Sequence, residues 1–349
     1  MKKVVYSLLL FGAAIVLSSC MKSARTGESP RLGKSPPVDA DPEMTAIRLD
    51  LYTRLGLPKA DPKSKEMHPP PGKMIDIGGY SLHLYCTGQA KPGRPTVVFE
   101  AGGFSIGLVW LVVQGGLDPT VRVCTYDRAG LGWSERSPLP RDMDHIVGEL
   151  HTLLDKARVS RPLLLVGHSY GGPMVRTFER MYPSEVSGLV LVDPADKEPG
   201  ETDQGFDQKM YDEYAKEIPG IKATMREEIV KVEQNQDLTD QKRRDEYANL
   251  LASSLWTLQS LKAMVTEGSF FHRTMDEIRA NPSQTIKDKP LTVISAEKGE
   301  LNLRRFHPAI VATSTKGKHI VAAGSDHMVQ QDRPDVVIEA VKEMLADLE

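Results

Sequence analysis

The chain has 349 residues, of which 40% are hydrophobic and 26% charged, so it is long and apolar enough to bury a full core. This composition excludes a disordered chain and, with only three cysteines, a small scaffold held by disulfides. The formal net charge is −3 and no basic run stands out, which argues against a nucleic-acid partner.

The N-terminus has the order of an export signal: Lys2 and Lys3 precede an apolar run over residues 4–17, and small residues follow. The run is shorter than the roughly twenty residues that a transmembrane helix needs. Residues 17–20, Leu-Ser-Ser-Cys, resemble the lipobox of bacterial lipoproteins, whose cysteine is lipidated. We therefore expect residues 1–19 to be a lipoprotein signal peptide. Lipidated Cys20 would then hold an exported protein at a membrane surface of the bacterial cell envelope.

Residues 20–71 are rich in Ser, Gly, Lys and Pro and are predicted to be a tether. One short amphipathic helix is expected within it, because Asp41 can cap a helix that has Pro42 in its first turn and Gly56 at its end. The apolar residues of this helix share one face: Met44, Ile47, Leu51 and Leu55. Its polar face is not basic, which favours packing against the rest of the protein over a membrane role.

From Gly78 onward, short β-rich runs alternate with helical patterns, which predicts a mostly parallel sheet covered by helices on both faces. An early edge strand is expected at residues 80–86, and a further strand before Gly78 stays open. Near-continuous apolar runs predict buried strands at residues 96–100, 121–126, 163–167, 189–192, 291–295 and 320–323. Helical spacing occurs at residues 146–154, 174–182 and 336–348.

The alternation stops over residues 197–284, which divide the α/β core into residues 72–196 and 285–349. Amphipathic helices are expected there. One apolar face combines Phe206, Met210, Tyr214 and Ile218, and a longer one combines Leu250, Leu251, Leu255, Trp256, Leu258 and Leu261. Because the segment follows the carboxyl end of a strand, where α/β sheets bind ligands, we predict a helical cap or lid. A packing role alone is the alternative.

One serine lies in the pattern of a tight strand-to-helix turn. Residues 167–171 read Gly-His-Ser-Tyr-Gly and fit G-x-S-x-G, after an apolar strand and before a helix. The glycines leave room for a turn that presents the hydroxyl of Ser169 above the sheet. Ser169 is therefore predicted to be a nucleophile.

Two further motifs resemble those of the α/β-hydrolase superfamily, from about Met74 to the C-terminus. Residues 127–134 resemble its D-x-x-G-x-G-x-S turn, which is mostly structural, and residues 324–327 look like its G-x-x-H loop. The resemblance implies an α/β-hydrolase fold, with a mostly parallel eight-stranded sheet, helices on both faces and a helical lid. It also implies His327 as general base. No two of the nine histidines have a convincing metal-ligand spacing, so neither metal nor cofactor is expected.

The acid of the triad has three candidates. Many α/β-hydrolases carry an Asp after the penultimate strand, but here that loop contains only Glu297 and Glu300. Asp193, directly after the strand ending at Val192, resembles the position that some lipases and dehalogenases use instead. We predict Asp193, with Glu297 as the alternative acid and Glu300 third. A purely structural role for Asp193, capping a turn, stays open.

An oxyanion hole needs two backbone N–H groups beside the nucleophile. Tyr170, directly after Ser169, is expected to supply one of them. Most relatives carry His-Gly after the third strand, whereas this chain has Ala101 and Gly102, so we assign the second N–H to Gly103. Glu100 is an unusual residue at the end of this strand. Two interpretations stay open, a buried polar support and a substrate contact.

Cys86 and Cys124 map to the second and fourth strands, which are neighbours in the resembled fold. In an exported protein they could be oxidised to a disulfide. Two free, buried thiols are the alternative.

These features predict a serine hydrolase that cleaves a small-molecule carboxylic ester through a Ser-His-acid triad and an acyl-enzyme. The apolar residues of the lid suggest a substrate with an apolar part. Epoxide hydrolases and haloalkane dehalogenases of this fold carry an Asp where Ser169 stands. An amidase, lactonase or carbon–carbon bond hydrolase would use the same triad, and a non-catalytic, lipid-anchored binding protein is a rival from another class. The sequence predicts no oligomeric state.

Overall fold

The structure is a computed structural model that describes residues 42–57, 70–117, 119–197, 207–280, 286–299 and 303–349. The predicted signal peptide, Cys20 and the capping residue Asp41 lie outside these ranges. Phe206 and Glu300 also lie outside them.

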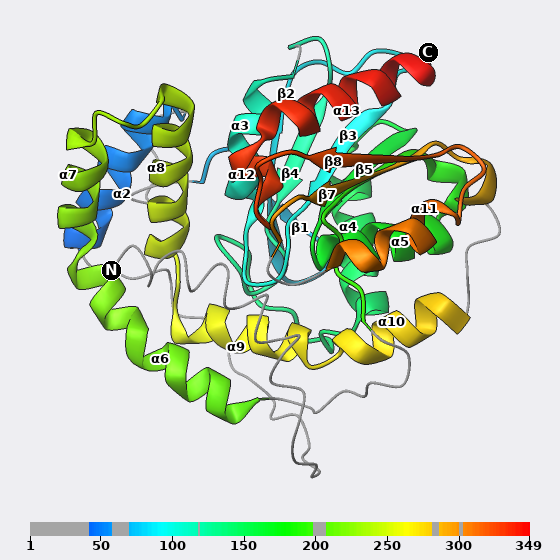
Figure 1. Ribbon diagram of the computed structural model, residues 1–349. Helices are drawn as coiled ribbons and strands as arrows, with labels where there is room; N and C mark the ends of the chain where they lie inside the picture. The colour runs from blue at the N-terminus through cyan, green and yellow to red at the C-terminus, as the bar shows by residue number, and fades with distance from the viewer. Residues whose placement is uncertain (1–41, 58–69, 118, 198–206, 281–285, 300–302) are drawn as a thin grey trace.

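An eight-stranded sheet in the order β1-β2-β4-β3-β5-β6-β7-β8 forms the centre of the protein (Figure 1). Its strands are β1 (Lys73–Asp76), β2 (Ser81–Thr87), β3 (Thr96–Glu100), β4 (Val123–Tyr126), β5 (Leu163–His168), β6 (Val186–Val192), β7 (Leu291–Ala296) and β8 (Gly317–Ala322). The pairs β1–β2 and β2–β4 are antiparallel, and all other neighbouring pairs are parallel. The predicted fold class is confirmed, and β1 is the strand before Gly78.

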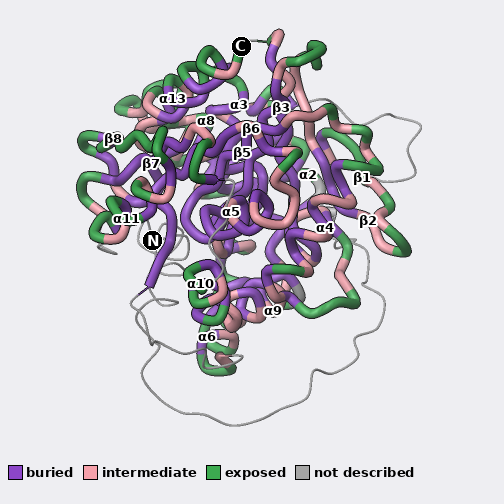
Figure 2. Tube along the Cα trace, turned by 90° about the vertical axis from the view of Figure 1, so that its right-hand side faces the viewer, coloured by how far each residue is buried: buried purple, intermediate pink, exposed green. Residues whose placement is uncertain are grey.

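Helices cover both faces of this sheet. On one side lie α4 (Met143–Lys156), α5 (Gly171–Met181) and α11 (His307–Val311), and on the other α3 (Leu111–Gly115), α12 (Val329–Asp332) and α13 (Pro334–Asp347). Short 3-10 turns occupy Gly107–Trp110, Pro183–Glu185, Ile286–Asp288 and Leu303–Arg305. The two layers follow from the period-two alternation of the strands: Leu163 and Leu165 pack toward α4 and α5, whereas Leu164 and Val166 pack toward α3 and α13. Figure 2 shows the central strands buried between these layers.

One predicted strand differs in its environment. The apolar run at residues 320–323 was expected to form a buried strand, but β8 lies at the edge of the sheet and is largely exposed along its length. Val321 is 37% exposed, and among the described residues no further strand pairs with the outer edge of β8. An apolar run alone does not separate an edge strand from a central one.

Between β6 and β7 the described residues form five helices and no strand. They are α6 (Gln208–Ala223), α7 (Met225–Gln234), α8 (Asp240–Ser254), α9 (Leu258–Gly268) and α10 (Phe271–Ala280). The single long apolar face expected from Leu250 to Leu261 is wrong, because Thr257 begins a new helix with a capping box to Ser260. Leu258 is consequently 53% exposed.

The first helix of the described residues packs against this helical insertion. The helix α2 (Pro42–Leu55) packs along α8, and Figure 1 shows it beside α7 and α8. Its residues Met44, Ile47, Leu51 and Leu55 are all buried in one cluster with insertion residues. Arg48 donates hydrogen bonds to the carbonyl and hydroxyl oxygens of Ser254 at 2.6 and 3.2 Å. None of the helices in the described ranges is long and apolar enough to cross a membrane.

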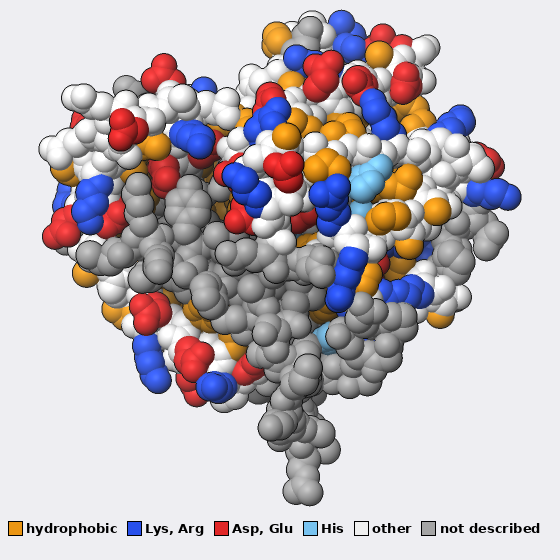
Figure 3. All heavy atoms as spheres, viewed as in Figure 1, with side chains coloured by type: hydrophobic (Ala, Val, Ile, Leu, Met, Phe, Trp, Pro, Cys, Tyr) orange, Lys and Arg blue, Asp and Glu red, His pale blue; other side chains and the backbone are white. Residues whose placement is uncertain are grey.

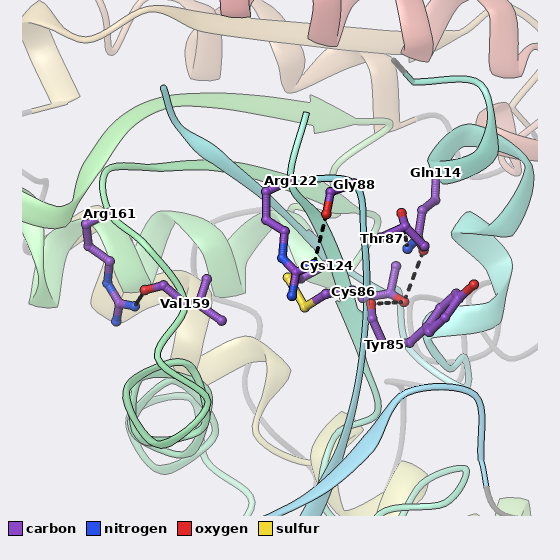
Figure 4. The surroundings of a disulfide bond; sticks show 10 residues. Tyr85, Cys86, Thr87, Gly88, Gln114, Arg122, Cys124, Val159 and Arg161 are labelled. Atoms are coloured by element: carbon purple, nitrogen blue, oxygen red, sulfur yellow. Dashed lines mark hydrogen bonds between the residues drawn. A yellow bond between two sulfur atoms is a disulfide. The ribbon is translucent and has the colours of Figure 1, made fainter. Parts of the chain in front are cut away.

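The two strand cysteines form a disulfide. Cys86 and Cys124 are directly opposite in the antiparallel β2–β4 pair, with Cα atoms 4.1 Å apart (Figure 4). Arg122 donates to the carbonyl oxygen of Gly88 beside it, at 3.0 Å. The bond joins β2 to β4, which pairs in parallel with β3. The expectation of an edge strand at residues 80–86 is wrong, because β1 pairs with the other side of β2.

Replacing both Cys86 and Cys124 by Ala should lower the free energy of unfolding by about 2–4 kcal/mol, because the bond closes a loop of 38 residues in the unfolded chain. Urea unfolding of the oxidised protein, with and without reductant, measures the difference. The double variant is the control, since reductant should not change its midpoint. An oxidised wild type that unfolds at the same urea concentration with and without reductant would contradict the prediction.

Candidate active site

The predicted site residues follow the carboxyl ends of parallel strands. Ser169 follows β5, Asp193 follows β6 and His327 lies in the loop after β8. The register pairs His168 with Val192, and Val192 with Ile294, so the ends of β5, β6 and β7 lie level with one another. The parallel sheet therefore brings together residues that are far apart in the sequence.

Ser169 occupies a strained turn with a φ of +50° and is 5% exposed. A Cβ atom on Gly167 would lie 2.4 Å from the carbonyl oxygen of Gly171, and one on Gly172 would lie 2.6 Å from the Cβ of Pro194. Both positions therefore require glycine. The carbonyl oxygen of Ser169 accepts hydrogen bonds from the N–H groups of Gly172 at 2.9 Å and Ala195 at 3.0 Å, which holds the turn.

Asp193 contacts His327 directly. Its Oδ2 lies 2.7 Å from Nδ1 of His327, and its Oδ1 accepts a hydrogen bond from the N–H of Ala296 at 2.9 Å. Burial alone would raise the pKa of this carboxyl, but the hydrogen bonds from His327 and Ala296 hold it below its usual value. Asp193 is therefore an ionised acceptor that fixes the proton of His327 on Nδ1.

Glu297 lies elsewhere, on the exposed side of the same loop region. Its Oε2 accepts a hydrogen bond from the N–H of Gly324 at 2.7 Å, so it supports the turn that carries His327 without contacting the imidazole ring. Among the described carboxylates, Asp193 alone is hydrogen-bonded to the ring of His327.

The second ring nitrogen of His327, Nε2, is buried and has no hydrogen-bond partner among the described residues. With Nδ1 protonated toward Asp193, Nε2 carries the lone pair. A general base needs a free nitrogen of this kind.

His168, next to Ser169, has a role that the sequence did not indicate. Its Nε2 donates to the carbonyl oxygen of His327 at 2.9 Å, and the two rings lie 4.7 Å apart. Burial lowers the pKa of His168 to about 3, so the ring is neutral at ordinary pH. His168 thus ties the nucleophile turn to the loop of His327 without adding a charge. The pattern G-x-S-x-G leaves this position unspecified.

The loop after β3 lies against the nucleophile. A Cβ atom on Gly102 would be 3.2 Å from the Cβ of Ser169 and 2.9 Å from Nδ1 of His168. One on Gly103 would be 3.8 Å from the Cβ of Tyr170. The structure therefore brings together the two residues, Gly103 and Tyr170, to which the sequence assigned the oxyanion N–H groups.

Glu100 is a buried support, 1% exposed. Its Oε1 accepts from Arg128 at 2.9 Å, and its other oxygen accepts from the hydroxyl of Tyr126. Arg128 also donates to the carbonyl oxygens of Ala101 at 2.8 Å and Gly102 at 2.9 Å. Burial raises the pKa of Glu100, although the positive charge of Arg128 opposes this. Arg128 itself was missed, because its turn was treated as structural.

The rest of that turn is structural, as expected. Asp127 accepts hydrogen bonds from the N–H groups of Gly107 at 2.9 Å and Trp133 at 3.2 Å, and contacts Nδ1 of His83 at 2.9 Å. A Cβ atom on Gly132 would lie 2.3 Å from the carboxylate of Asp127. These contacts are all within the turn and its neighbours, away from Ser169.

Residues 95–334 match the family model for the alpha/beta hydrolase fold, and the chain belongs to this family. The chain is 39% identical over 127 residues to the probable transporter efuK of Hormonema carpetanum, covering 35% of this chain and 18% of that protein. It is 33% identical over 109 residues to a (lyso)-N-acylphosphatidylethanolamine lipase of Bos taurus, covering 30% of this chain and 32% of that protein. The chain thus spans less than a third of the length of either relative.

The fold is also that of a thermophilic esterase from Thermogutta terrifontis, with a TM-score of 0.55. The similarity covers 77% of this chain and 94% of the esterase, at 17% sequence identity. At that identity the comparison concerns the fold alone.

The geometry predicts different outcomes for the two candidate acids. Asp193→Asn should lower kcat for hydrolysis by about 10⁴-fold, because the amide no longer fixes the tautomer of His327. Glu297→Gln should keep kcat within about threefold of the wild type, since its contact is to a backbone N–H. Steady-state kinetics of the two purified variants make the comparison. Normal turnover in Asp193→Asn, with collapse in Glu297→Gln, would reverse the assignment.

Proposed function

We propose that this chain is a serine hydrolase that cleaves a carboxylic ester. The observation that carries the proposal is the hydrogen-bonded pair of Asp193 and His327 beside Ser169, which is held in a strained turn at the carboxyl end of β5. Membership of the alpha/beta hydrolase family supports a hydrolase. The name of the lipase among the similar proteins favours an ester.

In the proposed reaction, Nε2 of His327 takes the proton of Ser169 as its Oγ attacks the carbonyl carbon of the ester. The negative charge that develops on the carbonyl oxygen is stabilised by the N–H groups of Gly103 and Tyr170. His327 then gives its proton to the departing alcohol, leaving an acyl group on Ser169. Water, deprotonated by His327, attacks this acyl-enzyme. His327 then returns the proton to Oγ of Ser169 as the acyl–oxygen bond breaks and the carboxylic acid leaves. Throughout, ionised Asp193 stabilises the imidazolium ring.

An apolar part of the substrate is favoured by the surroundings of the loop after β3. Phe104 and Ile106 on this loop belong to a buried apolar cluster with residues of α6, α8 and α9. The rings of Phe104 and Tyr214 lie 6.0 Å apart. An acyl or alcohol chain that binds between this loop and the helical insertion would contact these apolar side chains. An amide, a lactone or a carbon–carbon bond would use the same residues.

A fluorophosphonate probe tests whether the site is catalytic. It should label the wild type at Ser169, and Ser169→Ala should abolish labelling and lower turnover of p-nitrophenyl esters by about 10⁶-fold. Ser187→Ala is the matched control, because Ser187 lies near the start of β6, at the opposite end of the strands, and should keep both properties. An unlabelled, inactive wild type would instead favour a binding protein on a hydrolase scaffold. Esters of increasing chain length would then define the acyl preference.

We further propose that the protein is exported and anchored through lipidated Cys20, on the strength of the N-terminal sequence. Cys20→Ala should move the protein from the membrane fraction to the soluble fraction, with ester hydrolysis retained. Fractionation followed by an activity assay checks both points. Equal membrane retention of Cys20→Ala and wild type would reject lipidation as the anchor.

A further inference from the structure

Glu267, the second-last residue of α9, contacts both sides of the proposed oxyanion hole. Its carboxylate accepts a hydrogen bond from Nε of Arg128 at 3.0 Å. Its backbone carbonyl accepts one from the hydroxyl of Tyr170 at 3.2 Å. Tyr170 and Gly103 are the two proposed N–H donors. Glu267 is thus bonded directly to Tyr170, and it is bonded to Arg128, which holds the loop of Gly103.

Arg128 determines how the loop presents its N–H groups. Its two hydrogen bonds to the loop are to the carbonyl oxygens of Ala101 and Gly102. A trans peptide is planar, so its C=O and N–H point in opposite directions. With the oxygen of Gly102 held toward Arg128, the N–H of Gly103 must point away from Arg128.

Packing constrains this peptide on one side only: Ser169 and His168 lie close to Gly102, whereas the surroundings of Gly103 are loose. Consecutive glycines have wide conformational freedom. Around the Cβ position of Gly103, the nearest described atom is the Cβ of Tyr170 at 3.8 Å. On the Gly103 side, the hydrogen bonds from Arg128 therefore supply a constraint that side-chain packing does not.

Burying the charged side chains around Arg128 costs desolvation free energy, and a gain in stability alone does not explain why they are buried. Arg128 is 2% exposed, and Glu100 and Glu267 are each 1% exposed. Glu267 also contacts Arg141 at 3.0 Å, and Arg141 contacts Glu149 at 2.6 Å. Buried ion pairs of this kind are often no more stabilising than apolar residues of the same volume. The five buried charged groups are better explained by the conformation that they impose on the loop after β3 than by stability.

We propose that Arg128 and Glu267 are positioning residues that set the oxyanion hole and make it depend on the docking of α9. The inference rests on the proposed serine-hydrolase function. Arg128 orients the peptide between Gly102 and Gly103, and Glu267 fixes both Arg128 and Tyr170 from the helical insertion. Displacement of α9 would leave Arg128 with one carboxylate partner fewer and Tyr170 without this hydrogen bond.

The experiment compares kcat, KM and the affinity of a trifluoromethyl ketone, which forms a tetrahedral oxyanion on the serine. Arg128→Met should lower kcat by about 10²-fold with KM within about threefold, and weaken ketone binding by a similar factor. Glu267→Gln should show the same pattern with a smaller loss, because the amide oxygen can still accept from Arg128. Arg128→Lys should recover part of kcat, since its ammonium can reach one of the two carbonyl oxygens.

The matched control is Glu149→Gln, at the far end of the same network. Glu149 contacts Arg141 and the hydroxyl of Tyr80, and neither bonds to the loop of Gly103. This variant should lose stability to heat yet keep kcat and ketone affinity within about threefold of wild type. It separates a general effect of the buried charges from an effect on the oxyanion hole.

Selective loss of kcat and ketone affinity in the Arg128 and Glu267 variants supports the proposal. Equal losses in Glu149→Gln, or a folded Arg128→Met with wild-type kcat, overturn it. Should Arg128→Met not fold, Glu267→Gln and Arg128→Lys decide, and unchanged kcat and ketone affinity in both overturn it. A wild type that the fluorophosphonate does not label would reject the hydrolase function itself, which is a separate outcome.

Discussion

The site depends on the backbone hydrogen bonds that join the turn of Ser169 to the turn of Asp193. The N–H of Ser169 donates to the carbonyl oxygen of Val192, and the N–H of Ala195 donates to the carbonyl oxygen of Ser169. Both residues have a positive φ, +50° for Ser169 and +40° for Asp193, which costs conformational energy in non-glycine residues. Each strained turn is thus held by the other. The spacing between Ser169, the proposed nucleophile, and Asp193, the proposed acid, follows from main-chain geometry, and only the imidazole of His327 comes from a distant loop.

Charge and exposure are distributed in keeping with a buried site. On the face drawn in Figure 3, the described Lys, Arg, Asp and Glu side chains are interspersed, in agreement with the small formal charge of −3. Inside the protein, by contrast, Arg128 and Glu267 face each other in an environment from which water is excluded. Burial disfavours the charge of Arg128, but its two carboxylate partners raise its pKa above the usual value. The interior therefore holds a fixed positive group behind the loop after β3.

Local sequence predicted most of the fold, because strand runs and the G-x-S-x-G pattern are local signals. The pattern around Ser169 needs two glycines at fixed spacing, Gly167 and Gly171, and at both positions a Cβ atom would lie too close to backbone oxygen atoms. The environment of β8 was not predictable in this way, since edge position depends on strand order and not on the residues of the strand.

The choice between Asp193 and Glu297 also required the three-dimensional structure. Both residues directly follow strands of the sheet, and only the distance to His327 distinguishes them. Arg128 was missed for a related reason: its partners Gly102 and Glu267 are far away in the sequence, and no spacing connects them. His168 likewise gains its partner, the carbonyl oxygen of His327, from a loop 159 residues away.

The helix α2 changes what counts as the functional unit. The family match begins at residue 95, yet the apolar face of α2 fills part of the core beneath α8, and Cys86 belongs to a strand that also precedes the match. A protein trimmed to the matched residues would keep Ser169, Asp193 and His327. It would lack α2 and so expose the apolar surface of α8 that α2 covers, and it would leave Cys124 as a single thiol. Such a fragment would contain every residue of the proposed triad and still be prone to aggregate.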